Sequence, residues 1–96
     1  MANERRIVLI PEMPADLDLD FVFETDRGVA VRASDATVQV LRDRGIPVAE
    51  LFRSSNEYAG AVLGLPREQA LAAIESVQNA ALAALSTEER GRFRVA

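Results

Sequence analysis

The sequence predicts an α+β fold, in which antiparallel strands come first and helices follow. Strand-forming side chains are concentrated in the first third of the chain, and apolar and acidic residues alternate over residues 16–24. Residues 65–85 have instead the composition of one long helix, rich in Ala, Leu, Glu and Gln. Because the strands precede the helices rather than alternate with them, this order favours α+β over a parallel α/β sheet.

The first third of the chain predicts two or three antiparallel strands. Residues 5–10 contain four consecutive strand-forming apolar side chains, and such a run indicates a strand that is covered on both faces. Residues 16–24 and 29–33 predict a β-hairpin around the turn-forming residues 25–28, with Gly28 available for a positive φ. The apolar face of the first hairpin strand would consist of Leu17, Leu19, Phe21 and Phe23.

Three helices are predicted after the hairpin. Ser34 is a good N-cap for a helix that ends at about residue 44, and Gly45 suits the left-handed position after it. Pro47 can start a further turn. That turn would carry Val48, Leu51 and Phe52. Ser54 and Glu57 then form a capping-box pattern for a second helix that ends near Gly64.

The third and longest helix is predicted over residues 66–85, and an apolar stripe follows one side of it. The helix stripe consists of Leu71, Ile74, Gln78, Ala81 and Leu85. Its spacing resembles two heptads with a polar residue at the seam, but two heptads are too few to argue for a coiled coil, so an ordinary core stripe is preferred. The apolar arc is wider than a three-stranded sheet needs, which predicts a second contact surface.

Composition excludes several classes of active site from this chain of 96 residues, which is predicted to form one domain over residues 1–96. It contains no Cys, no His and no Lys, so disulfides, zinc–thiolate sites, histidine bases and Schiff-base chemistry are excluded. No catalytic constellation or phosphate loop is recognisable. We therefore predict a protein that is not an enzyme and needs no cofactor.

Three carboxylates at a spacing of two residues form the acidic triplet. The acidic triplet consists of Asp16, Asp18 and Asp20. Its spacing matches the first ligands of a calcium loop, but that loop needs Gly where Phe21 stands and Glu where Arg27 stands, so no metal site is predicted. The acidic triplet instead predicts a solvated strand face or a docking surface for a basic partner.

The end of the chain could contribute a short final strand beside the acidic triplet. Arg92 and Arg94 alternate with apolar residues at the same period as Asp18 and Asp20. If the two strands paired, within one chain or between two, opposite charges would face each other.

Residues 57–74 combine small, apolar and glycine side chains in an order that resembles a helix-turn-helix. The residues that carry the resemblance are Gly60, Leu63, Gly64, Leu65 and Ile74. It implies a transcriptional regulator linked to DNA or to a small ligand. The helix that would read DNA has only Arg67 as a basic residue and the net charge is −4, so nucleic acid is not expected as a main partner.

The leading functional prediction is a non-enzymatic accessory or regulatory protein that acts by protein–protein contact. The acidic triplet would steer the partner and the helix stripe would supply buried area. The partner would be another protein or a second copy of this chain, as in a homodimer. No apolar run is long enough for a signal peptide or a membrane span, so a cytoplasmic location is predicted.

Overall fold

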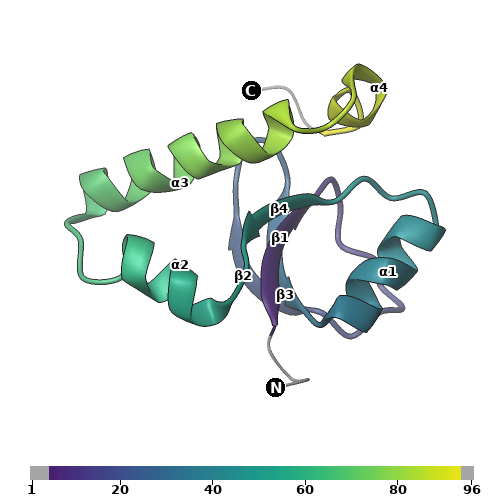
Figure 1. Ribbon diagram of the computed structural model, residues 1–96, viewed down its shortest axis with the longest axis horizontal. Helices are drawn as coiled ribbons and strands as arrows, with labels where there is room; N and C mark the ends of the chain where they lie inside the picture. Colours follow the sequence, from purple (N-terminus) through teal and green to yellow (C-terminus); the bar gives the residue numbers. More distant parts are fainter. Residues whose placement is uncertain (1–4, 94–96) are drawn as a thin grey trace.

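The structure is a computed structural model, and it describes residues 5–93. Figure 1 shows an antiparallel sheet with helices on both sides of it. The four strands of the sheet are arranged in the order β2-β3-β1-β4. Their bounds are β1 (Arg6–Ile10), β2 (Asp20–Glu24), β3 (Val29–Ala33) and β4 (Ala49–Phe52). The predicted α+β class is confirmed.

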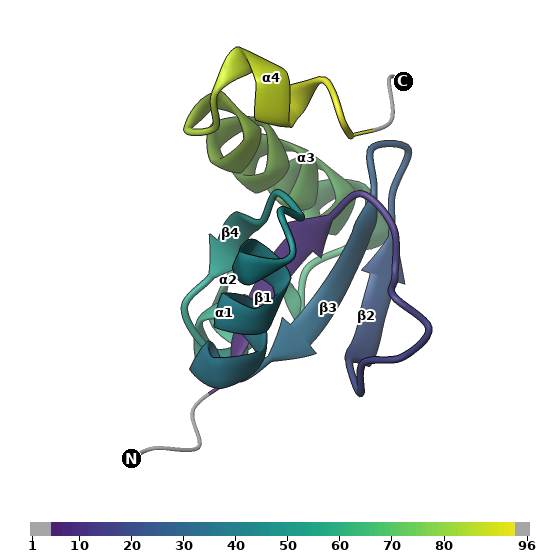
Figure 2. The same cartoon turned by 90° about the vertical axis from the view of Figure 1, so that its right-hand side faces the viewer.

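The helices lie on both faces of the sheet. Helix α1 (Asp35–Asp43) connects β3 to β4 and covers one face, while α2 (Ser55–Val62) and α3 (Arg67–Ala83) cover the other (Figures 1 and 2). A single turn, α4 (Thr87–Arg90), follows α3. No helix within residues 5–93 combines the length and the apolar character needed to cross a membrane.

Strand β1 contributes to both cores of the molecule. Ile7 and Leu9 pack on the side of α2 and α3, whereas Val8 and Ile10 pack on the side of α1, and all four side chains are buried. The prediction that residues 5–10 form a strand covered on both faces is therefore confirmed. A continuous apolar run suits this central position, because neither face of β1 meets solvent.

The predicted helix ends around α1 are also confirmed. The Ser34 hydroxyl accepts a hydrogen bond from the backbone N–H of Thr37. Gly45 has a φ of +77°, and the N–H of Ile46 donates to the carbonyl of Leu41 at 3.0 Å, which closes the helix in a Schellman motif. Local chemistry alone therefore defines both ends of this helix.

The prediction that Pro47 starts a further helical turn is wrong, because residues 49–52 form strand β4. Ile7 pairs with Phe52 and Val8 pairs with Glu50, so Leu51 is an extra residue in a β-bulge. The bulge lets two consecutive apolar residues, Leu51 and Phe52, both be buried. Because the bulge breaks the alternation expected of a strand, the sequence pattern of residues 49–52 resembles that of a helical turn.

The first hairpin strand is shorter than predicted, and its apolar residues do not share one face. Strand β2 begins only at Asp20, and a register shift between Phe21 and Phe23 pairs these residues with Val31 and Ala30. Val31 and Ala30 belong to opposite cores. Phe23 therefore packs on the side of α2 and α3, while Phe21 lies on the side of α1 and remains 60% exposed.

The predicted turn between β2 and β3 is confirmed, but the reason for its glycine differs. The Thr25 hydroxyl accepts hydrogen bonds from the backbone N–H groups of Arg27 and Gly28, each at 3.1 Å. The φ of Gly28 is not positive. A Cβ at this position would lie 2.4 Å from the carbonyl oxygen of Ile10, so close backbone packing is what requires glycine.

Candidate functional site

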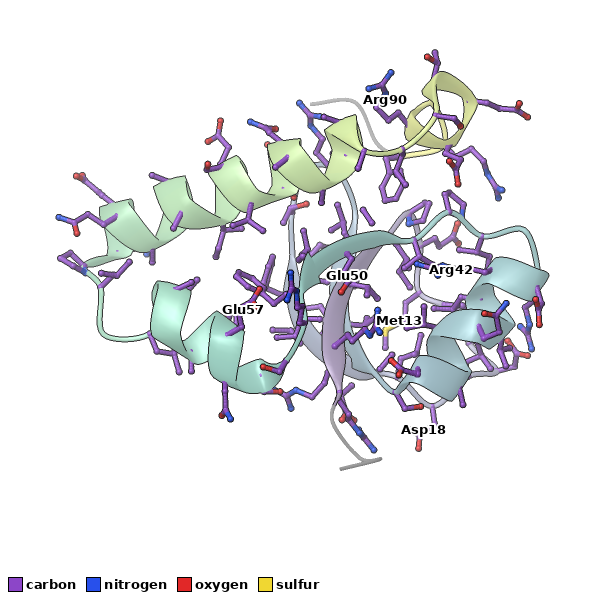
Figure 3. All side chains as sticks on the ribbon, in the orientation of Figure 1. Met13, Asp18, Arg42, Glu50, Glu57 and Arg90 are labelled. Carbon is purple, nitrogen blue, oxygen red and sulfur yellow. The ribbon has the colours of Figure 1, made fainter. Side chains whose placement is uncertain are left out.

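The acidic triplet lies in the loop before β2 and at the start of β2, and arginines neutralise two of its members. Asp16 accepts two hydrogen bonds from the Arg44 guanidinium, at 2.7 and 3.0 Å, and these bonds lower the pKa of Asp16 below its ordinary value. Asp20 forms an ion pair with Arg5. Asp18 forms no ion pair with the described residues and points away from the fold (Figure 3).

The triplet is therefore not one continuous acidic face, as its sequence spacing suggested. An extended strand from residue 16 would have placed the three carboxylates together, but residues 11–19 form a loop instead. The pairing with Arg44 joins this loop to the end of α1. Of the three members of the acidic triplet, only Asp18 forms no ion pair with the described residues.

The outer edge of β2 carries an exposed aromatic side chain. Strand β2 is a terminal strand, and within residues 5–93 no other strand pairs with its outer side (Figure 2). Phe21 stands on this edge with 60% of its surface exposed. Glu24 and Asp26 follow it at the end of the strand and in the turn. An open strand edge with an exposed aromatic ring and nearby carboxylates can accept an additional strand.

The helix stripe is largely part of the chain's own core. Ile74, Ala81 and Leu85 pack against the core between the sheet and α3, and Gln78 is only 7% exposed. Leu71 is the exception, with 54% of its surface exposed. The buried side of α3 also includes Ala70, Val77 and Leu82, which lie beside the predicted stripe. The stripe thus covers the sheet, and only Leu71 is open to a partner.

The C-terminal residues do not reach the acidic triplet within the described part of the chain. Residues 91–93 form no strand, and Arg92 donates a hydrogen bond to the carbonyl of Gly45. Phe93 is buried in the core beneath α3. The predicted contribution of Arg94 lies outside the described residues. Across residues 5–93, no group of three acidic, His or Cys side chains is placed to hold a metal ion.

A groove of about 360 Å³ runs between the β2–β3 turn and α3. The turn and the end of β2 line it with Glu24, Thr25, Asp26 and Arg27, and α3 lines it with Leu71, Ile74, Glu75, Gln78 and Asn79. Three carboxylates and one guanidinium therefore surround an opening with an apolar wall. Sequence reasoning missed this groove, because only the tertiary structure brings residue 24 beside residue 75.

Phe21 was also missed as a surface residue. The sequence places Phe21 and Phe23 on one apolar face, but the bulge between them turns Phe23 into the core and leaves Phe21 on the other face of the terminal strand. No residue type in the sequence indicates this bulge. No family model, no curated protein and no solved structure matches the chain, so its function has to be inferred from the edge of β2 and the adjoining groove.

Proposed function

We propose that this protein is a non-enzymatic accessory or regulatory protein, and that it binds an extended, basic segment of a partner along the outer edge of β2. The observation that carries the proposal is Phe21, an aromatic side chain that is 60% exposed on an unpaired strand edge. A strand added to β2 would gain backbone hydrogen bonds from the edge and apolar contact from this ring.

Edge protection alone does not account for this surface. Carboxylates such as Asp18 and a bulge are ordinary means of preventing strands from associating at an edge. A large exposed aromatic ring has the opposite effect, because it supplies apolar area to an incoming strand. The combination of repulsive charge with an apolar anchor favours a selective edge, one that accepts basic segments and rejects acidic or neutral ones.

A second copy of this chain is a poorer partner for the same edge. If two β2 strands paired antiparallel across a two-fold axis, Asp18, which lies just before the strand in one copy, would approach Glu24 at the end of the strand in the other. Like charges directly opposite each other destabilise such a pair. A heterologous basic segment avoids this repulsion, so it is preferred over the homodimer at β2.

The alternative of a DNA-linked regulator has less support. Helices α2 and α3 are joined by a turn in which Gly64 has a φ of +88°, as the predicted helix-turn-helix would require. The ionisable residues of α3 are Arg67, Glu68 and Glu75, so this helix carries more negative than positive charge. Helices that bind in the major groove need the reverse.

The proposal can be tested by selecting peptides from a display library of random linear sequences against the intact chain at moderate salt. The selected peptides should combine basic and apolar residues. Phe21→Ser and Asp18→Arg should each lower the affinity of a selected peptide by about tenfold or more. Added salt should weaken binding, since part of the attraction is between charges exposed to solvent.

Two variants serve as matched controls. Leu63→Ser removes another exposed apolar side chain and Glu68→Arg reverses another exposed charge, and neither residue lies in the sheet. Both variants should bind the peptide like the wild type. The proposal is refuted if Phe21→Ser binds as tightly as the wild type, or if the selected peptides lack basic residues.

A further inference from the structure

Gln78 has a buried carboxamide with an unsatisfied oxygen. It is the one polar side chain among the described residues that is buried, at 7% exposure. Its Oε1 has no hydrogen-bond donor within residues 5–93. A buried acceptor without a donor costs about 1–3 kcal/mol, and an apolar side chain of similar size would avoid this cost. The buried amide therefore points to a donor from outside the described residues.

The groove between the β2–β3 turn and α3 is where such a donor can approach, because Gln78 forms part of its wall. Oε1 itself is shielded from solvent, so a ligand reaches it by rotation about the last side-chain torsion. The groove volume of about 360 Å³ lies within the range of small-ligand sites.

The charges of the groove define the kind of donor that it would accept. Asp26 and Glu75 form no ion pair with the described residues. With three carboxylates and one guanidinium in its wall, the groove as a whole has a net negative charge. A cation is therefore preferred over a neutral or anionic group. Leu71 and Ile74 provide an apolar wall along which methylene groups can lie.

We propose that this groove binds a guanidinium group on an alkyl stem. The planar guanidinium offers several N–H donors at once, so it can satisfy the Gln78 carboxamide and a carboxylate together. Resting on the proposed function, we further assign this group to an arginine side chain of the segment that docks on β2. Glu24 ends β2 and also lines the groove, so the edge and the groove are continuous.

The probe for the groove is agmatine, a free alkyl guanidinium, titrated into the isotopically labelled chain and followed by NMR. We expect saturable shifts of the Gln78 side-chain amide and of the backbone amides of residues 24–27. N-butylurea, a neutral analogue, should produce none of them. Absence of these shifts, or equal shifts with the urea, would overturn the proposal.

Variants of α3 test which side chains hold the guanidinium. Gln78→Met and Glu75→Gln should each weaken agmatine binding by about tenfold. Gln69→Met and Glu68→Gln make the same changes on exposed positions of α3 outside the groove, and they should leave binding unchanged. If the two control variants weaken agmatine binding as much as Gln78→Met and Glu75→Gln do, agmatine is attracted only by the overall negative charge of the surface. The assignment of the site to the groove is then wrong.

Citrulline substitution in a selected peptide separates this inference from the proposed function. The arginines of the peptide are replaced by citrulline one at a time. One of these replacements should weaken binding of the peptide to the wild-type protein but not to the Gln78→Met variant. If peptide binding depends on Phe21 but on no arginine, the edge of β2 remains the docking site and the groove assignment fails. If agmatine binds the groove while no peptide binds, the guanidinium comes from a free small molecule, and the arginine assignment is overturned.

Discussion

Replacing Gln78 by Met should make the protein more stable. Removing the unsatisfied Oε1 recovers about 1–3 kcal/mol, and an apolar replacement of similar volume costs less than about 1.5 kcal/mol. Gln and Met have nearly equal helix propensities, so α3 itself is unaffected. The expected net gain is about 1 kcal/mol, which raises the Tm of a domain of this size by about 4–8 °C.

The assay is urea denaturation of wild type, Gln78→Met and the control Gln69→Met, followed by circular dichroism and supported by thermal melts. Gln69 is exposed on the same helix, so its replacement should change the free energy of unfolding by less than about 0.5 kcal/mol. A Gln78→Met chain that is less stable than wild type would refute the reasoning. It would mean that Oε1 has a hydrogen-bond donor in solution, and the groove would then lose its unsatisfied acceptor.

Three further predictions concern the core, the turn and the surface. Leu9→Ala in β1 should lower the free energy of unfolding in urea by about 2–5 kcal/mol, and a loss below about 1 kcal/mol would contradict the two-sided core. Gly28→Ala should lower the free energy of unfolding by about 1–3 kcal/mol, since the added Cβ meets rigid backbone. Gly60→Ala adds a Cβ in open space in α2, so it should raise the free energy of unfolding by about 0.5–1 kcal/mol in the same assay. If both variants changed the stability in the same direction, the packing described for these two glycines would be wrong. Because Arg44 lowers the pKa of Asp16 in the folded chain, this carboxylate adds stability above its unfolded pKa of about 3.8, and the addition is lost as pH falls through the lower folded value. Melts of wild type and Asp16→Asn should therefore converge in acid, and a difference that stays constant with pH would exclude this ion pair.

Features that depend on local chemistry could be predicted from the sequence. The caps of α1 at Ser34 and Gly45 follow from side-chain hydrogen bonding and from the left-handed φ that glycine tolerates. The predicted cap of α2 is another example, since the Ser54 hydroxyl accepts a hydrogen bond from the backbone N–H of Glu57 within the same turn. Strand β1 was equally clear, because its apolar run has no polar face to obscure it.

Features that depend on strand register could not be predicted. The bulges opposite β1 and within β2 shift the alternation by one residue, which hid β4 and put Phe23 on the opposite face of the sheet from Phe21. Such a shift reverses which face each later side chain occupies. The candidate site was affected in the same way, since the exposed ring and the groove both result from how distant segments meet.

The central position of β1 has a consequence for synthesis of the protein. Its partners β3 and β4 end at Ala33 and Phe52, so both are made after it. Until these strands have been made, the nascent chain exposes β1 as an apolar strand with two open edges. Partly folded chains of this kind readily aggregate or bind chaperones. Emergence of Phe52 closes both edges of β1, but Ile7 and Leu9 stay uncovered until α3 has been made, so ribosome-bound chains of this protein should engage a chaperone until α3 has emerged.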